Sequence, residues 1–232
     1  MIVPVHRAAD LANIRRNLEA QTWPDIEAIL IPNGDLAGSS TTQEALGDLP
    51  YVRILSAQAG TIGSYLNHGL DAATGTWIMR FDSDDTYLPD YIVNTLCLLS
   101  ASGADLTYKP AMFMHMQALD LVLLQSEADA FLPRIGGSGA TQAFRRDALE
   151  GLRYDERMVR SEDAQFARAL VRAGGKIITA PPFDFVVTRH ADKSRHTWHL
   201  GDFNLYGHRS FVGGGSVIPA LGMPIFQPQA EP

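Results

Sequence analysis

The sequence predicts an α/β fold in which a mostly parallel sheet is flanked by helices. Short apolar β-type runs alternate with segments of helical spacing over the first 90 residues, as in βαβ units. A chain of 232 residues with 46% hydrophobic and 19% charged side chains is long enough to bury one sizeable core. We find no internal repeat and no linker-like segment, so we expect a single domain.

The N-terminal half carries the clearer pattern, with strands expected over residues 2–5, 28–31, 51–55 and 77–81. Leu11, Ile14 and Leu18 follow helical spacing, and Asp10 is suited to the N-cap of that helix. A second helix is expected over residues 64–73. Pro89 is suited to the first turn of a third helix, because its missing N–H costs nothing there.

The second half is less regular. Strands are expected over residues 105–109, 176–179 and 185–189, and Ser161 is expected to cap a helix that ends at Gly174 and Gly175. Residues 110–134 are rich in Met and favour no clear assignment, although alternating methionines suggest one face of a strand. We expect a domain over 1–200, with halves 1–100 and 101–200, and an irregular Gly- and Pro-rich tail over 201–232.

Composition excludes several classes of protein. The net charge is −7, so binding to nucleic acid through phosphate neutralisation is disfavoured. The single cysteine, Cys97, excludes an internal disulfide and a cysteine-based zinc site, and its apolar helical surroundings predict a buried thiol. Neither a signal peptide nor an apolar run of about 20 residues is visible. We expect a soluble cytoplasmic protein; peripheral membrane attachment and homo-oligomerisation stay open.

An acidic cluster follows the fourth expected strand. Asp82, Asp84 and Asp85 lie where ligands usually bind in open α/β sheets, just beyond the carboxyl end of a strand. Three carboxylates within four residues repel one another, and a divalent cation with oxygen ligands relieves that repulsion. The alternative is a turn followed by a helix N-cap, which the same residue types favour.

Two later clusters are also candidates for function. Glu162 and Asp163 fall in the first turn of an expected helix, where either the helix dipole or a general base explains them. Residues 189–196 hold two arginines, a lysine and two histidines, a composition that suits a diphosphate or an exposed loop. The Gly-rich segment 136–139 lacks the spacing of a phosphate-binding P-loop.

Taken in order, these segments resemble the family 2 glycosyltransferases of the GT-A fold. The segments that carry the resemblance are IVPVH at 2–6, QTWPDIE at 21–27, NHGLDAATGTWI at 67–78, FDSDD at 81–85 and ED at 162–163 followed by GGKI at 174–177. The resemblance implies a single GT-A-type domain with a Rossmann-like sheet.

The resemblance also implies an activity and a set of site residues. Sugar passes, with inversion, from a nucleotide sugar to a hydroxyl of a glycan, glycolipid or small molecule, with Mn²⁺ or Mg²⁺ as cofactor. By this resemblance Asp163 is the general base and Glu162 helps to position the acceptor. The implied metal ligands are Asp84, Asp82 and His196. The implied donor contacts are Pro4, His6, Asn33, Asp82, Ser83 and Arg195.

Two departures from the family pattern bear on the donor. The resemblance implies a UDP-sugar donor. Pro32, however, replaces an acidic residue that usually contacts the nucleobase, and Leu66 stands where an arginine is common, so the identity of the base is left open. Alternatives are a nucleotide-binding domain that acts with a partner subunit and a nucleotidyltransferase. A dehalogenase-type phosphatase fits residues 81–86 locally, but its motif belongs on a first strand.

Overall fold

The central sheet contains three parallel strands that continue into a mixed sheet. This computed structural model describes residues 1–56, 59–125, 129–192 and 209–223. Strand order is β3-β2-β1 in the first part and β4-β9-β6-β10 in the second, and a parallel bridge between Ile2 and Arg80 joins them. The strands are β1 Ile2–Val5, β2 Ala28–Pro32, β3 Val52–Ile54, β4 Trp77–Met79, β6 Leu106–Tyr108, β9 Ala143–Arg145 and β10 Ile177–Thr179.

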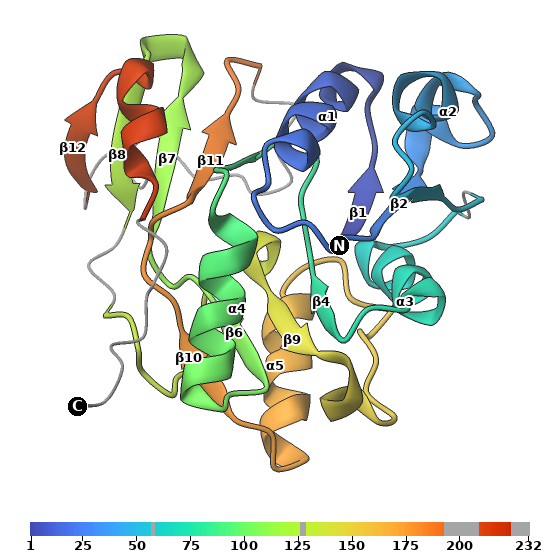
Figure 1. Cartoon of the computed structure of the whole chain (residues 1–232), viewed down its shortest axis with the longest axis vertical. Helices are drawn as coiled ribbons and strands as arrows, with labels where there is room; N and C mark the ends of the chain where they lie inside the picture. Colours follow the sequence, from blue (N-terminus) through green and yellow to red (C-terminus); the bar gives the residue numbers. More distant parts are fainter. Residues whose placement is uncertain (57–58, 126–128, 193–208, 224–232) are drawn as a thin grey trace.

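Helices cover both faces of this sheet (Figure 1). On one face, Val3 and Val5 pack in a core with residues of α1, α2 and α4. On the other, Ile2 packs with residues of α3 and α5. The alternation follows from the two-residue repeat of a strand, so the apolar run at 2–5 is buried on both faces. The helices are α1 Leu11–Glu19, α2 Thr41–Leu46, α3 Ile62–Ala72, α4 Tyr91–Ser102 and α5 Glu162–Arg172.

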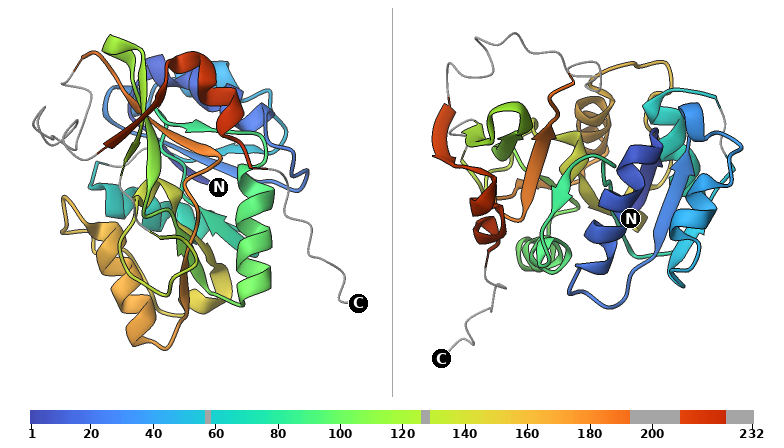
Figure 2. Two further views of the ribbon diagram at one scale, coloured as in Figure 1. Left: turned by 90° about the vertical axis from the view of Figure 1, so that its left-hand side faces the viewer. Right: turned by 90° about the horizontal axis from the view of Figure 1, so that it is seen from above.

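A second sheet lies beside the first and was not expected from the sequence (Figures 1 and 2). Its order is β12-β8-β7-β11-β5, and only β7 and β11 pair in parallel. Met112, Met114 and Met116 lie along β7 as the alternation suggested, yet Phe113 is buried too. With both faces covered, this strand has little polar alternation to reveal it. The strands are β5 Thr86–Tyr87, β7 Met112–Met116, β8 Leu121–Gln125, β11 Phe185–Arg189 and β12 Arg209–Gly213.

The described part of the C-terminal segment is more regular than expected. Residues 209–213 form β12, and a 3-10 helix follows at Gly215–Leu221. Leu221 is buried in a cluster with Leu88, Phe113, Val122 and Val186. The Gly and Pro residues of this segment therefore permit a strand and a turn that close the second sheet. None of the helices in the described ranges is long and apolar enough to cross a membrane.

Local capping differs from the sequence expectation at two helices. Asp10 and Ser161 occupy the N-cap positions of α1 and α5, but neither side chain bonds the first turn. Ser161 has a left-handed backbone, with φ +61°. Pro89 lies two residues before α4 rather than within it, and Cys97 is only partly buried. Since Asp10 is released from capping, its carboxylate is available for a contact described below.

The topology brings several strand ends to one edge of the sheet. β1, β2 and β4 run parallel, so the segments after Val5, Pro32 and Met79 leave the sheet on the same side. The acidic segment of residues 82–85 follows β4 directly. This is the edge at which open α/β sheets bind ligands.

Candidate active site

The backbone of the acidic segment is held from two directions. Asn13 of α1 donates to the carbonyl oxygens of Ser83 and Asp85, at 2.9 and 2.7 Å, and Asn17 donates to Asp85 O at 2.8 Å. On the other side, the Asp82 N–H donates to Tyr87 Oη at 2.8 Å. These bonds fix the loop before any ligand arrives, as preorganisation requires.

Arg80 joins the acidic segment to α5. Its Nε donates to Asp82 Oδ1 at 2.9 Å, and its Nη1 donates to Glu162 Oε1 at 2.8 Å. Arg80 is 8% exposed and Glu162 is 6% exposed, so this is a buried ion pair. Burial lowers the pKa of Arg80 while Asp82 and Glu162 raise it, and the net shift is upward. The guanidinium is therefore permanently charged between the two carboxylates.

Asp163 follows Glu162 in the first turn of α5 and is partly buried. Its Oδ1 accepts a hydrogen bond from the Ala164 N–H at 2.7 Å. Burial raises the pKa of Asp163, and the Ala164 bond offsets only part of that increase. A carboxylate whose charged form is disfavoured is a better proton acceptor than an ordinary aspartate, which is the property of a general base.

Asp84 points toward the end of β11. Its Oδ2 lies 4.0 Å from Nε2 of His190, and the Asp84 side chain keeps 25% of its surface exposed. The Asp82 side chain is 31% exposed. Both carboxyl side chains are thus partly exposed, although no cluster of three His, Cys, Asp or Glu suited to a metal occurs within the described residues.

Two other residues of the acidic segment face the protein interior. Asp85 accepts from the Thr188 N–H at 3.0 Å, and burial together with Asp84 and Asp82 raises its pKa well above the ordinary value. Ser83 is buried, and its hydroxyl donates to Asp10 Oδ2 at 3.2 Å. Asp85 ties the segment to β11, and Ser83 ties it to the start of α1.

A polar pair occupies the ends of β1 and β2. Asn33 is buried, and its amide nitrogen donates to Ile31 O at 3.1 Å. The Asn33 oxygen therefore faces His6, whose Nδ1 lies 3.0 Å away and carries the shared proton. Because Nδ1 carries the proton, Nε2 is left as an acceptor, and the exposed His6 ring can offer it to a ligand. Pro4, one strand position earlier, is partly exposed.

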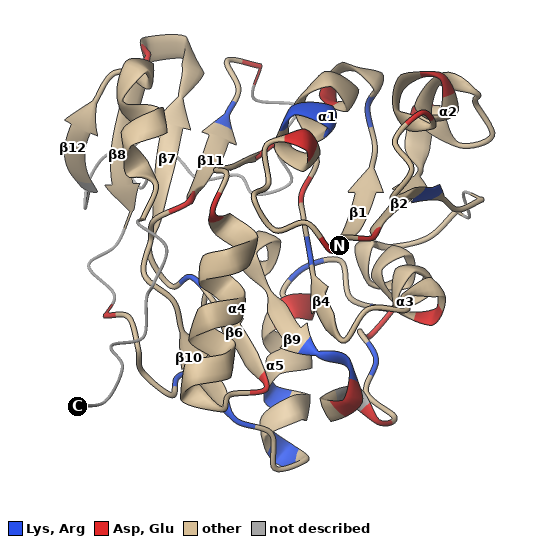
Figure 3. Cartoon of the chain, viewed as in Figure 1, with Lys and Arg blue, Asp and Glu red and all other residues tan. Residues whose placement is uncertain are grey.

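The sequence candidates are thus partly assembled. Asp82, Glu162 and Asp163 gather around Arg80, Asp84 lies on the β11 side, and His6 and Asn33 form a pair of their own. Arg195 and His196 lie outside the described residues. Over the described ranges, basic and acidic residues are interspersed along the ribbon in Figure 3, without one continuous basic band.

Arg80 and the two asparagines of α1 were missed by sequence reasoning. Arg80 had a detectable signal, because it is the only charged residue in the apolar run of residues 77–81. A charge in a buried strand normally has a partner, and the nearby Asp82 is one. Asn13 and Asn17 are four residues apart on one face of α1, but nothing local shows that they meet a loop 70 residues away.

Gly139 offers a direct test of how closely the site is packed. A Cβ built there would lie 2.8 Å from both Arg80 Nη1 and Asp163 Oδ2. We expect Gly139→Ala to displace these groups, to destabilise the fold by about 1–3 kcal/mol and to lower turnover at least tenfold. Denaturation and donor turnover would check this. Gly75→Ala is the control, because its Cβ would meet only Trp77 O at 3.4 Å. Unchanged turnover in Gly139→Ala would contradict the prediction.

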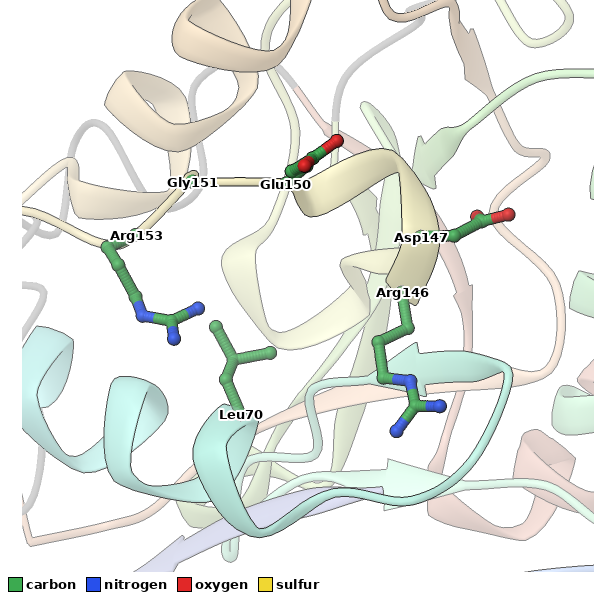
Figure 4. A pocket seen from close by; sticks show the side chains of 6 residues that line it. All are labelled: Leu70, Arg146, Asp147, Glu150, Gly151 and Arg153. Atoms are coloured by element: carbon green, nitrogen blue, oxygen red, sulfur yellow. The ribbon is translucent and has the colours of Figure 1, made fainter.

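A pocket of about 400 Å³ lies elsewhere, and it is lined by Leu70, Arg146, Asp147, Glu150, Gly151 and Arg153. Arg146 and Arg153 flank Leu70 from two sides (Figure 4). The Arg146 N–H donates to Thr76 O, just before β4 begins. This pocket is therefore at the opposite end of β4 from the acidic segment, and it adds no residue to the candidate site.

Solved structures that share this architecture include a mannosyltransferase, and they agree with the expected GT-A fold. The mannosyltransferase PcManGT of Pyrobaculum calidifontis, solved with GDP-Man and Mn²⁺, aligns with a TM-score of 0.64 at 19% identity, over 83% of this chain and 56% of that one. TarS of S. aureus, solved with UDP-GlcNAc, aligns with a TM-score of 0.63 at 15% identity, over 88% of this chain and 62% of that one. These likenesses show the fold.

Sequence comparison points to one family. Residues 1–109, slightly under half of the chain, match the model of glycosyl transferase family 2. The succinoglycan biosynthesis protein ExoO of Rhizobium meliloti is 24% identical over 207 residues, which are 80% of this chain and 59% of ExoO. An uncharacterized glycosyltransferase of Rickettsia bellii is 25% identical over 150 residues, which are 59% of this chain and 21% of that protein. The chain thus spans about a fifth to three fifths of these relatives.

Proposed function

We propose that this protein transfers a sugar from a nucleotide-sugar donor to a hydroxyl group of a carbohydrate or lipid-linked acceptor, with inversion at the sugar carbon. The observation that carries the proposal is the meeting of the acidic segment after β4 with the first turn of α5, through Arg80. The match of residues 1–109 to the model of glycosyl transferase family 2 and the donors bound by the structural neighbours support it.

The chemistry assigns one role to Asp163. Its carboxylate accepts the proton of the acceptor hydroxyl as that oxygen forms a bond to the sugar carbon. The bond from the same carbon to the diphosphate oxygen breaks, and the electron pair leaves with the diphosphate. Attack on the face opposite the leaving group inverts the configuration. A single displacement of this kind needs a base but no protein nucleophile.

The residues present fit a hard divalent cation. The Asp84 and Asp82 side chains are partly exposed, although the Asp82 oxygens also accept from Arg80. Mg²⁺ and Mn²⁺ are usually held by one or two carboxylates together with substrate phosphates. When bound there, the ion supplies Lewis-acid stabilisation of the leaving diphosphate. The protein's own contribution is to hold these carboxylates in place through Asn13, Asn17 and Arg80.

His6 favours particular nucleobases. Its Nε2 is an acceptor, because Asn33 fixes the proton on Nδ1. Uracil and guanine present a ring N–H on the pairing edge, whereas cytosine presents an acceptor at its N3. We expect UDP or GDP to bind at least tenfold more tightly than CDP, a difference of about 1.4 kcal/mol. Calorimetric titration of wild type and His6→Ala would check this, with His115→Ala in the second sheet as control. Equal affinities in wild type would contradict it.

The proposal as a whole is tested by thermal melting of the purified protein with UDP, GDP, TDP and CDP, each with and without Mn²⁺. A ligand that binds only the folded state raises the melting temperature by mass action. We expect one nucleoside diphosphate to give a shift that requires Mn²⁺. If no nucleotide shifts the melting temperature under any condition, the transferase proposal is wrong for this chain alone, and a domain that acts with a partner subunit becomes the better account.

A further inference from the structure

Arg80 is buried between carboxylates that belong to different parts of the reaction. Its partner Asp82 follows β4, and its partner Glu162 opens α5, 82 residues further along the chain than Arg80. The next residue of α5 is Asp163. One guanidinium therefore contacts the acidic segment and the helix turn that presents the proposed base.

We propose that Arg80 is a positioning residue that couples the donor-side carboxylate Asp82 to the first turn of α5, and thereby sets the place of Asp163 relative to the donor. This inference rests on the proposed function, because that function assigns Asp82 to the donor side and Asp163 to the acceptor side. Neither the family match nor the fold likeness assigns a role to Arg80.

The geometry of the contact requires arginine. A planar guanidinium presents several N–H donors in a fixed fork, so it can satisfy two carboxylates on different sides. Here Nε and Nη2 point to the two oxygens of Asp82, at 2.9 and 3.4 Å, while Nη1 points to Glu162 at 2.8 Å. A lysine ammonium is a compact charge on a flexible stem, and we expect it to reach only one of the two carboxylates.

The packing around Arg80 limits any other arrangement. Gly139 allows the guanidinium and Asp163 to approach the same backbone segment, where a Cβ would lie 2.8 Å from both. The carbonyl of the next residue, Ala140, accepts from Tyr87 Oη at 2.8 Å. Tyr87 Oη in turn accepts from the Asp82 N–H. A shift at Asp82 is therefore transmitted to both the Gly139 turn and α5.

Coupling of this kind is reciprocal. If a bound donor alters the contact between Asp82 and Arg80, the contact between Arg80 and Glu162 changes in stability. A change at Glu162 alters the stability of the Asp82 contact by the same coupling free energy. The proposal thus predicts that Asp82 and Glu162, which share Arg80, are not energetically independent.

The first test needs no ligand and is a double-mutant cycle on stability. Asp82→Asn, Glu162→Gln and the double variant are unfolded with denaturant, in the native background and with Arg80→Met. With Arg80 present, we expect the double variant to lose more than the sum of the single losses, because it leaves a buried cation uncompensated. In the Arg80→Met background the losses should become additive, and the equally uncharged Arg80→Gln serves as the second background if Arg80→Met fails to fold. Additive losses with Arg80 present would overturn the proposal.

The second test separates positioning from folding and from binding. Arg80→Lys is compared with Arg15→Lys, because Arg15 also bonds two carboxylates, Glu19 and Asp48, on the exposed surface of α1. UDP-GlcNAc and GDP-Man are the probes, each with Mn²⁺, and hydrolysis to the nucleoside diphosphate is measured. We expect Arg80→Lys to change donor affinity less than threefold but to lower turnover at least 30-fold, and Arg15→Lys to change neither. Equal losses of affinity and turnover, or unchanged turnover, would overturn the positioning role.

A comparison of two Glu162 variants tests whether the hydrogen bond to Arg80 is enough to preserve turnover. The amide oxygen of Glu162→Gln still accepts the Arg80 N–H, so we expect turnover within about fivefold of wild type, whereas Glu162→Ala should match Arg80→Lys. If both Glu162 variants are equally impaired, the charge rather than the contact matters, and the proposal is wrong. If wild type binds neither nucleotide sugar, the proposed function fails, while the stability cycle still decides the coupling.

Discussion

Asp163→Asn is expected to lower the rate of sugar transfer by about 100- to 10,000-fold while leaving donor affinity unchanged. The amide still fills the space in the first turn of α5, but it accepts no proton from the acceptor hydroxyl. Turnover and nucleotide titration on the same preparation would measure both quantities. The matched control is Glu44→Gln, since Glu44 lies in the first turn of α2, exposed and bonded to Ser40. Normal transfer by Asp163→Asn would exclude Asp163 as the base.

The same residue predicts a pH dependence. Because burial raises the pKa of Asp163, its charged form appears at higher pH than for an ordinary aspartate. Turnover should therefore rise with pH through that raised pKa. The folded-state pKa lies above the unfolded one, so the carboxyl's contribution to stability is present below the unfolded pKa and is lost as pH rises through the folded pKa. We expect Asp163→Asn to melt at a higher temperature than wild type at pH 7, with the difference shrinking toward pH 3.

Asp84→Asn is expected to remove the Mn²⁺ dependence of nucleotide binding. The Asp84 side chain is 25% exposed near the end of β11, whereas Asp85 is buried, and an amide is a far weaker ligand for a hard cation. Nucleotide affinity in saturating Mn²⁺ should fall at least about tenfold, to the level seen without metal. Calorimetric titration of UDP or GDP with and without Mn²⁺ would measure this.

Asp90→Asn is the control for that loss, because Asp90 lies nearby in sequence but bonds Thr22 Oγ1 at the surface. A full Mn²⁺ effect in Asp84→Asn would mean that other residues hold the ion. In that case the assignment of Asp84 as a metal ligand would have to be withdrawn.

Most of the first sheet could be predicted from the sequence because its signals are local, although the antiparallel strand β9 was not among the expected strands. The runs at 2–5 and 28–31 are short and apolar, and each forms a strand at nearly those limits. The second sheet could not be predicted in the same way, although the run at 185–189 does form one of its strands. β7 is buried on both faces, and β12 lies in a Gly-rich segment whose pairing with β8 depends on residues far away in the chain.

The candidate site, too, could be predicted only in part from the sequence. The acidic segment and the Glu162–Asp163 pair are visible as residue types in sequence. Their roles depend on contacts that the sequence does not show. The Asp10 carboxylate accepts a hydrogen bond from the Ser83 hydroxyl instead of capping α1, and Glu162 accepts one from Arg80. Asp85 has the residue type of a metal ligand, but it is buried and bonds the backbone of β11.

The antiparallel strand β9 has a consequence for the order in which the nascent chain can fold. β9 lies between β4 and β6, so one edge of β4 stays open until residues 143–145 have left the ribosome. At about 5–20 residues per second, the 65 or so residues after β4 take roughly 3–13 s to synthesise. During that time Trp77, Ile78 and Met79 present an apolar strand edge to other chains. Truncated or slowly translated chains should aggregate through this edge, and the site, which needs α5, is completed only after the edge has closed.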